Sequence, residues 1–255
     1  MEIILEAKGV NKVFGTRRSS YSALKNIDLK MLKGEFVGVM GPSGAGKSTL
    51  LNVLSSIEKP SSGIVSIGGE NLQNLSDHDL TEYRRGKMGF IFQEYFLLDT
   101  LTIKENILLP LAFSHISVDE MNKKVIELAN RFGIQDILEK YPYEVSGGQQ
   151  QRTAVCRAIA CDPSIIFADE PTGALDSKSA YQLLETLVEL NKEYQSTILM
   201  VTHDAYAASF CSRIIFIKDG SLYTEIRKGN HSRKHMYKQI LDILSTLGGM
   251  QHDIV

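Results

Sequence analysis

The sequence predicts an α/β fold with a mainly parallel, doubly wound sheet. From residue 164 onward, apolar strands alternate with helices, a rhythm that builds parallel sheets from β-α-β units. Near residue 40, a short apolar run leads into a glycine-rich loop, and the apolar spacing of a helix follows at once. At 255 residues, the chain is long enough for one large domain, or for one domain with a sizeable insertion.

The amino-terminal part is expected to supply the first strands and one helix. Residues 3–39 read as several short strands separated by polar turns, among them 16–20 and 32–35. The spacing of apolar residues predicts a helix over 48–54, directly after the glycine-rich loop. The other strands of this part are expected at 36–40, 63–69 and 88–93.

A helical insertion is expected between about 94 and 145. Apart from a break at Gly133, this stretch has helical patterning, and 118–138 is amphipathic and rich in Glu, Asn and Lys. The alternating strands and helix that follow are expected at 165–168, 180–193, 198–202 and 214–218. Beyond Gly220, a solvated segment with a docking helix over 237–247 is favoured over a dedicated binding site.

Composition narrows the class of protein. The chain is 43% hydrophobic and 23% charged, as soluble globular proteins are, and its net charge of −2 provides no positive field for nucleic acid. Its longest apolar runs are far shorter than the roughly 20 residues of a membrane-spanning helix, and its acidic, alternating start is unlike a signal peptide. Three cysteines without a C-x-x-C pair are typical of reduced thiols. We therefore expect a cytosolic protein that reaches a membrane only through a partner.

The most specific local motif is the loop after the strand at 36–40, which matches G-x-x-x-x-G-K-[ST] in full. The candidate phosphate-binding residues are Gly41, Pro42, Ser43, Gly44, Ala45, Gly46, Lys47, Ser48 and Thr49. Glycines let successive N–H groups point at one phosphate, and the following helix presents its positive end to the same anion. Lys47 would lie between the β- and γ-phosphates, and Ser48 would give its hydroxyl to Mg²⁺. A chance glycine-rich turn is the alternative, which the strand-loop-helix context disfavours.

Two carboxylates follow the apolar strand at 165–168. Asp169 could hold Mg²⁺ through the water shell of the ion. Glu170 would reach the other side of the γ-phosphate, where a carboxylate can orient and polarise the attacking water. The alternative is that both residues only cap the strand end and face solvent.

Two further strand ends carry candidate catalytic side chains. Gln93 ends the strand at 88–93, and its neutral amide could contact both Mg²⁺ and the attacking water. His203 follows the strand at 198–202 and could hydrogen-bond the γ-phosphate and sense its loss. A lone glutamine is uninformative and a lone histidine is more often structural. Both interpretations therefore depend on the ordered set of motifs around these residues.

The run Val145-Ser146-Gly147-Gly148-Gln149, here called the signature run, completes that set. Over residues 3–220, the ordered motifs resemble the nucleotide-binding subunit of ATP-binding-cassette (ABC) transporters. The resemblance implies a P-loop NTPase fold with a RecA-like core, an N-terminal antiparallel β subdomain and an inserted α-helical subdomain. It implies an ATPase domain over 1–220, with the core and β subdomain at 1–93 and 164–220, the helical subdomain with the signature run at 94–163, and a C-terminal extension at 221–255.

The resemblance also implies an ATP site shared between two copies of the chain. Paired head to tail, each copy would turn its phosphate loop toward the signature run of the other, whose helix start offers N–H groups to the γ-phosphate. Further ATP-binding residues are then Ser146, Gly147, Gly148, Gln149 and Asp176. Phe14 matches the position of an aromatic residue that stacks on adenine, although simple strand packing is the alternative. Val145 and Gly173 replace the commoner Leu and Ser, but neither removes a reacting group, so an active ATPase is expected.

Within this family, the stretch 169–176 resembles cassettes of lipoprotein release, macrolide export and antimicrobial-peptide resistance. The stretches 51–57, 89–102 and 216–224 resemble the last of these most closely, as in the Bce-type ATPases of bacitracin and lantibiotic resistance in Gram-positive bacteria. That resemblance implies two ATPase copies and one large permease at the cytoplasmic face of the plasma membrane, commonly with a sensor histidine kinase. The apolar run 95–98 matches the place where the family receives the cytoplasmic helix of the permease. Its alternative is a role in the core of the helical insertion.

Three other functions are alternatives to peptide resistance. The chain could serve a lipoprotein-release, macrolide-export or cell-division complex of the same family. A soluble ABC ATPase acting on DNA or ribosomes is disfavoured, because the chain has one uninterrupted cassette, no heptad run and no net basic charge. A scaffold with vestigial ATP use is disfavoured by the intact Lys47, Glu170 and His203.

Overall fold

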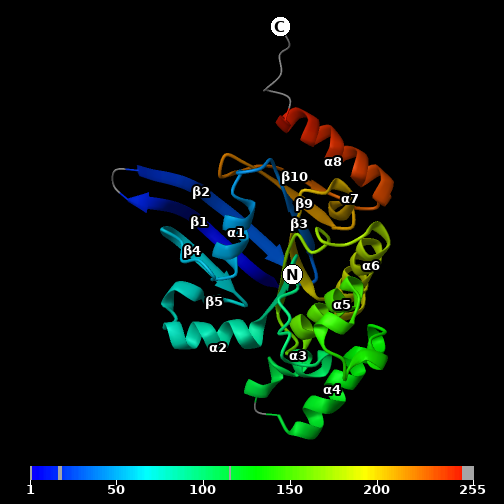
Figure 1. Ribbon diagram of the computed structural model, residues 1–255. Helices are drawn as coiled ribbons and strands as arrows, with labels where there is room; N and C mark the ends of the chain where they lie inside the picture. Colours follow the sequence, from blue (N-terminus) through cyan, green and yellow to red (C-terminus); the bar gives the residue numbers. More distant parts are fainter. Residues whose placement is uncertain (1, 17–18, 115, 249–255) are drawn as a thin grey trace.

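The chain forms two β-sheets with helices packed around them, as the computed structural model shows for residues 2–16, 19–114 and 116–248 (Figure 1). The strands are β1 (Ile3–Thr16), β2 (Ser19–Leu32), β3 (Phe36–Met40), β4 (Ser62–Ile67), β5 (Glu70–Asn71), β6 (Met88–Phe92), β7 (Ile165–Asp169), β8 (Thr197–Val201), β9 (Arg213–Lys218) and β10 (Ser221–Arg227). The helices are α1 (Lys47–Leu54), α2 (Asp77–Lys87), α3 (Ile103–Leu108), α4 (Val118–Arg131), α5 (Gly147–Ile159), α6 (Ser177–Tyr194), α7 (Ala205–Ala208) and α8 (Arg233–Gly248). Met1, His115, residues 17–18 of the predicted turn and residues 249–255 of the predicted extension lie outside the described residues.

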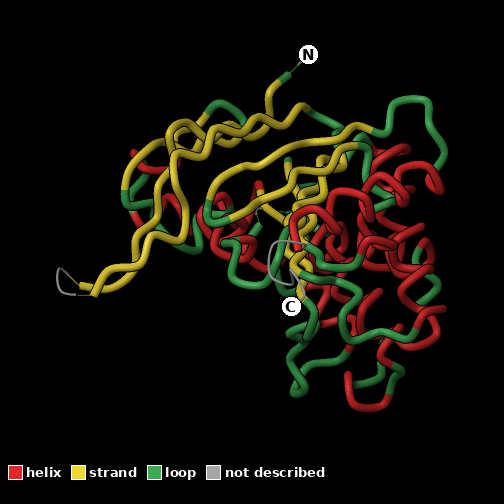
Figure 2. The backbone as a smooth tube through the Cα atoms, turned by 90° about the horizontal axis from the view of Figure 1, so that it is seen from above, coloured by secondary structure: helices red, strands yellow, loops and turns green. Residues whose placement is uncertain are grey.

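The first sheet is antiparallel and has the strand order β2-β1-β4-β5. The expectation of several short strands over 3–39 is wrong in one respect. β1 and β2 are each 14 residues long and run side by side to the tip of the hairpin (Figure 2). Their pairing shifts register repeatedly, for example between Ala7 and Val10, where Gly9 has φ +56°. These bulges interrupt the alternation of apolar residues without ending the strands, so the sequence pattern looks broken where the backbone is continuous.

The second sheet confirms the predicted mainly parallel α/β architecture. Its order is β10-β9-β3-β8-β7-β6; the pairs from β9 to β6 are parallel, and only β10 is antiparallel. The central strand β3 is buried at every position, which is typical of a strand covered on both faces. Residue 220, where the sequence places the start of the extension, lies in the turn between β9 and β10. Residues 221–227 therefore add a strand to this sheet.

Two hydrophobic cores lie against opposite faces of this sheet. Along β3, Phe36 and Met40 belong to the core that includes buried residues of α3 to α6, whereas Val37 and Val39 belong to the core shared with α1 and the first sheet. This alternation follows from the two-residue period of a strand. The phosphate loop and the strand ends that follow are thereby fixed between two packed layers.

The helical region begins later than expected. Residues 94–102 were expected to be helical but form turns and irregular structure, because Tyr95 and Phe96 adopt φ values of +57° and +47°. Regular helix starts after Thr102, whose side chain accepts a hydrogen bond from the Glu105 backbone N–H. The Glu105 carboxylate in turn accepts a hydrogen bond from the Thr102 backbone N–H. α4 and α5 begin with the same kind of reciprocal cap. None of the helices in the described ranges combines the length and the apolar character that crossing a bilayer requires.

The last helix, α8, packs beside α7 and α6 (Figure 1). The Arg233 guanidinium lies 4.2 Å from the ring centroid of Phe210 and within reach of the rings of Tyr181 and Tyr206, at 5.8 and 5.6 Å. It also contacts the Glu185 carboxylate at 3.2 Å. Cation–π contacts of this kind stabilise by about 0.5–1 kcal/mol each when partly exposed. The buried apolar residues of α8 are Met236, Ile240 and Leu247. The amphipathic pattern therefore corresponds to a docked helix, which begins at residue 233 and not at 237.

Candidate functional site

The phosphate loop and the predicted catalytic residues collect at the carboxyl ends of four adjacent parallel strands. The phosphate loop follows β3, and Gln93 follows β6. Asp169 ends β7 with Glu170 next in the chain, and His203 comes shortly after β8. These strands lie in the order β3-β8-β7-β6. Ligands of open α/β sheets bind at this edge because loops from neighbouring strands meet there.

The phosphate loop depends on two glycines for its course. A Cβ atom at Gly41 would lie 2.2 Å from the carbonyl oxygen of Ile217, and one at Gly46 would lie 2.6 Å from that of Ala23. Gly46 also has φ +101°, a backbone conformation that is unfavourable for residues other than glycine. α1 begins immediately afterwards at Lys47, so its N-terminus points at the loop. The loop is therefore held tightly against its neighbours in the shape that an anion cradle needs.

Lys47 lies between the phosphate loop and the two carboxylates. Its Nζ donates hydrogen bonds to the carbonyl oxygens of Gly41 at 2.9 Å and Pro42 at 3.0 Å. Burial lowers the pKa of the Lys47 ammonium, while the negative charges of Glu170 and Asp169 act in the opposite direction. This arrangement places a cation where a phosphate chain would lie along the loop.

Asp169 is a buried carboxylate whose side chain is incompletely paired. Its Oδ1 atom has no hydrogen-bond partner among the described residues. Burial and the neighbouring charge of Glu170 raise the pKa of Asp169, and Lys47 only partly opposes them. Ser48 and Gln93 line the same cavity of about 400 Å³, here called the catalytic cavity, together with Asp169 and Glu170. An unpartnered carboxylate oxygen beside a hydroxyl and an amide fits the oxygen ligands that Mg²⁺ prefers.

Glu170 and His203 meet each other at this edge. Glu170 Oε2 lies 2.9 Å from His203 Nδ1, a hydrogen-bond distance. The Glu170 backbone has φ +45° and its N–H donates to the Val201 carbonyl at 2.9 Å. A non-glycine residue in this conformation is strained, and such strain clusters at functional sites. The side chain of Gln151, buried in α5, donates to the Pro171 carbonyl at 3.1 Å and so holds the peptide that follows Glu170.

The signature run is not among the residues that line the catalytic cavity. Ser146 caps α5, accepting from the Gln149 N–H at 3.4 Å while the Gln149 side chain accepts from the Ser146 N–H at 2.9 Å. Ser146 and Gly147 are exposed. The run therefore presents a helix N-terminus to the surface, where N–H groups and the helix dipole favour an anion.

Asp176 is the cap of α6 and lies at the surface. Its carboxylate accepts from the N–H groups of Lys178 and Ser179 and from the Ser179 hydroxyl, at 2.9, 3.1 and 2.6 Å. The bond from the Ser179 hydroxyl is the main cause that lowers the Asp176 pKa. A Cβ atom at Gly148 would lie 3.1 Å from the Ser179 hydroxyl oxygen. The Asp176 segment therefore lies against the signature run of the same chain.

Phe14 stands near the phosphate loop with a second aromatic residue beside it. Phe14 is 39% exposed, so strand packing does not fully cover it, and the Lys12 ammonium lies 4.8 Å from the centroid of its ring. Directly opposite in the β1–β2 pair is Tyr21, whose hydroxyl donates to the Gly44 carbonyl at 3.3 Å. Sequence reasoning missed Tyr21. Its only signal is the register of the hairpin, which places it across from Phe14.

Replacing Asp169 by Asn should stabilise the protein while damaging any function that needs the carboxylate. A folded-state pKa above the unfolded value means that ionised Asp169 costs stability, a cost that grows as pH rises through the interval between the two values. At pH 7, the variant should melt about 2 °C higher in EDTA, because partial solvent exposure screens the cost to below about 1 kcal/mol. At pH 4 the difference should shrink. Thermal melts at both pH values check this, with Asp136→Asn, an exposed carboxylate, as the control. A lower melting temperature for the variant at pH 7 would contradict it.

Comparisons with known proteins agree with this geometry. A model of the ABC transporter family matches residues 24–173. The chain is 53% identical to the bacitracin export ATP-binding protein BceA of Halalkalibacterium halodurans, over 98% of this chain and 99% of that one. It is 52% identical to an uncharacterized ABC transporter ATP-binding protein of Bacillus subtilis, YvcR, over 98% and 97%.

A solved structure supplies the three-dimensional comparison. It is the dimeric ATP-binding cassette MJ0796 of Methanocaldococcus jannaschii in a post-hydrolysis state with ADP and phosphate, which matches with a TM-score of 0.80 and 41% identity over 88% of this chain and 98% of that one. This chain therefore shares its fold with a known cassette. The chain belongs to the ABC transporter family, as one of its ATP-binding, ATP-hydrolysing subunits.

Proposed function

We propose that this ATPase powers a membrane complex that protects its host from bacitracin-like antimicrobial peptides. The observation that carries the proposal is the 53% identity to a bacitracin export protein over nearly the whole of both chains. That likeness continues past residue 220, beyond the shared cassette motifs. The complex would lie at the cytoplasmic face of the plasma membrane, with the chain attached through a permease. A sensor histidine kinase would be an additional partner through that permease.

In this proposal, the phosphate loop and Lys47 hold the β- and γ-phosphates of ATP. Ser48, Gln93 and Asp169 would hold Mg²⁺, which when bound neutralises charge on the phosphate oxygens. Glu170 accepts a proton from the attacking water, and His203 contacts the γ-phosphate from the next strand end. The support is that Ser48, Gln93, Asp169 and Glu170 line one cavity. His203 contacts Glu170, and the charges of Glu170 and Asp169 act on Lys47.

A second copy of the chain would complete each site. The exposed helix start at Ser146 offers N–H groups to an anion, but it does not line the catalytic cavity of its own chain. The anion that it binds would therefore be held by another copy. The dimeric state of the related cassette with ADP and phosphate supports this arrangement. Each ATP would then be held by the phosphate loop of one copy and by Ser146, Gly147, Gly148 and Gln149 of the other, with Asp176 nearby.

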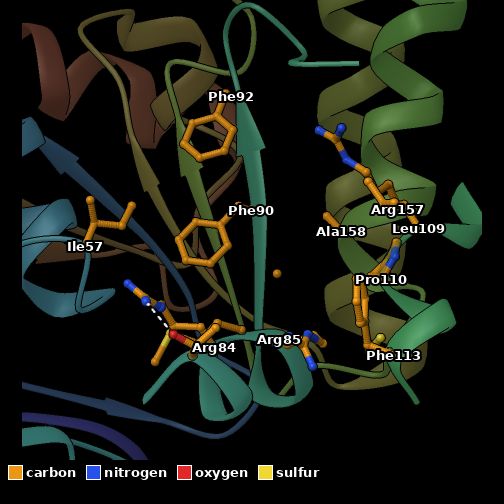
Figure 3. Close-up of a pocket in the computed structure, with 14 residues that line it drawn as sticks. Ile57, Arg84, Arg85, Phe90, Phe92, Leu109, Pro110, Phe113, Arg157 and Ala158 are labelled. Atoms are coloured by element: carbon orange, nitrogen blue, oxygen red, sulfur yellow. Dashed lines mark hydrogen bonds between the residues drawn. The ribbon is translucent and has the colours of Figure 1, made fainter. Parts of the chain in front are cut away.

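The permease would dock into an apolar pocket between the sheet and the helical region (Figure 3). The pocket has a volume of about 490 Å³, with Phe90 and Phe92 of β6 on one side and, on the other, residues of α5 and of the segment that follows α3. At its rim, Phe113 is 59% exposed and Arg85 lies 4.4 Å from its ring centroid. A pocket with an apolar floor and a cationic rim suits a short amphipathic helix with acidic residues at its edge.

The predicted contact run 95–98 does not line this pocket itself but packs against Phe92, which does. The ring of Phe96, which is 59% exposed, packs edge to face against Phe92 with centroids 5.2 Å apart. Gln93 lies between these two aromatic residues in the sequence. A helix that enters the pocket would therefore press on the segment that carries Gln93. This supports the contact role over a purely structural one.

The function is tested in the native host. Deleting the gene should lower the minimal inhibitory concentration of bacitracin severalfold, and the wild-type gene should restore it, whereas the Glu170→Gln variant should not. Nisin and a macrolide are tested in parallel. A strain that stays as resistant to bacitracin as before, but becomes sensitive to the macrolide, would replace this proposal with macrolide export.

Replacing Phe14 by Ala should weaken ATP binding without slowing the chemical step. Stacking on one exposed ring contributes about 1 kcal/mol, at the low end for a base on an aromatic side chain, which corresponds to about a fivefold rise in KM for ATP. Steady-state ATPase assays measure this, and kcat should stay within twofold. Tyr223→Ala, another exposed aromatic residue on β10, is the control. An unchanged KM would return Phe14 to a packing role.

A further inference from the structure

Two consecutive residues just after Gln93 have strained backbones. Tyr95 and Phe96 have φ values of +57° and +47°, although neither is a glycine. Each such residue costs about 1–2 kcal/mol, because the side chain crowds its own backbone. We call this pair the 95–96 turn. A strained pair persists only when neighbouring groups hold it, so the contacts that hold it determine where Gln93 lies.

Arg157 of α5 supplies these contacts. One guanidinium nitrogen donates to the Tyr95 carbonyl at 2.6 Å, and the other donates to the Phe96 carbonyl. Burial lowers the pKa of Arg157. Within the described part of the chain, Arg157 forms no salt bridge with a carboxylate, so its charge is committed to these two carbonyls. Charge-assisted bonds from a planar fork are among the strongest that a side chain offers a backbone.

The 95–96 turn also contacts the other end of the same helix. A Cβ atom at Gly147, the first residue of α5, would lie 3.2 Å from the Tyr95 hydroxyl oxygen. Arg157 thus binds the turn near the carboxyl end of α5. The Tyr95 side chain of the same turn lies against the start of α5, which belongs to the signature run. A helix is a stiff element, so these contacts make the turn move with α5 as one body.

We propose that Arg157 is a positioning residue that holds the 95–96 turn and thereby sets Gln93 in the catalytic cavity, so that the place of Gln93 follows the helix that carries the signature run. This inference rests on the proposed role of Gln93 in ATP hydrolysis. Arg157 also lines the pocket assigned to the permease, across from Phe90 and Phe92 (Figure 3). A partner that displaces the 95–96 turn would have to break these two hydrogen bonds, which links pocket occupancy to hydrolysis.

The test compares ATP hydrolysis by purified full-length variants at varied Mg²⁺ and ATP. Arg157→Ala should lower kcat about tenfold and raise the Mg²⁺ concentration for half-maximal activity at least threefold, with the dissociation constant of a fluorescent ATP analogue in EDTA within twofold of wild type. Arg157→Lys, which keeps the charge but not the fork, should fall in between. Arg131→Ala is the matched control, because this α4 arginine packs on Tyr194 and makes no bond to the turn.

A double-mutant comparison decides whether Arg157 acts through Gln93. If it does, Arg157→Ala with Gln93→Ala should be no slower than Gln93→Ala alone. The inference would be overturned if the losses of kcat from the two substitutions multiply in the double variant. It would also be overturned if Arg157→Ala has wild-type kinetics. If Arg157→Ala fails to fold, as a thermal melt would show, Arg157→Lys is used in the same double-mutant comparison. Wild-type ATPase activity without a bacitracin phenotype would overturn the proposed transport function alone and leave this inference standing.

Discussion

Glu170→Gln is expected to lower kcat for ATP hydrolysis at least 100-fold while ATP still binds. The amide keeps the size of the side chain and can still contact His203, but it cannot accept a proton from water. General-base catalysis contributes about 10² to 10⁴ in rate. Because ATP would bind without being cleaved, the variant should also accumulate as an ATP-bound dimer.

Phosphate release and size-exclusion chromatography with ATP measure the two effects. Glu94→Gln is the matched control, since Glu94 lines the same cavity one residue after Gln93 and has no assigned role. The control should keep kcat within threefold of wild type. Undiminished hydrolysis by Glu170→Gln would remove Glu170 from the mechanism, whatever the oligomeric state.

Mixing two inactive variants should restore ATP hydrolysis. Lys47→Ala removes the ammonium that the phosphate loop holds at 2.9 and 3.0 Å from two of its carbonyls. Ser146→Arg blocks the exposed start of α5. Each variant alone should lose more than 95% of the activity (about 2 kcal/mol of transition-state stabilisation). In a mixed pair, the loop of the Ser146 variant faces the intact signature run of the Lys47 variant, so one complete site returns.

The mixture should therefore reach up to about a quarter of wild-type activity at equal ratios, since half of the pairs are mixed and each has one site. Varying the ratio of the two variants at constant total protein should give a bell-shaped response. Activity that stays at the sum of the two separate variants would contradict head-to-tail sharing. Mixing Lys47→Ala with Glu170→Gln serves as the negative control, because in the mixed pair neither copy keeps both Lys47 and Glu170.

The sequence predicts the parts of the site that depend on local backbone. The phosphate loop is recognisable because its glycines, Lys47 and Ser48 act from one short segment. Asp169, Glu170 and His203 are recognisable because each lies at or shortly after the end of a buried parallel strand, and such strands end at one edge of the sheet. The fold class follows from the same alternation of strands and helices.

Other parts could not be predicted because they depend on tertiary contacts. Arg157 is an ordinary helix residue in the sequence, and only the folded chain brings its guanidinium to the carbonyls of Tyr95 and Phe96. Gln151 acquires its contact with Pro171 in the same way. The expected helix over 94–102 fails because a strained turn is stabilised by a side chain 62 residues away. Local pattern gives no sign of such a partner.

The three aromatic rings that surround Arg233 determine how this protein can be shortened or tagged in the laboratory. Phe210 and Tyr206 belong to the segment after His203, and Tyr181 belongs to the helix that Asp176 caps. A fragment that ends before residue 233 would expose to solvent these rings and the surface that Met236 covers. Such a fragment should aggregate even though every nucleotide motif is retained. Reporter fusions and affinity tags are therefore better placed at the amino end, and α8 belongs in any fragment meant for crystallisation or assay.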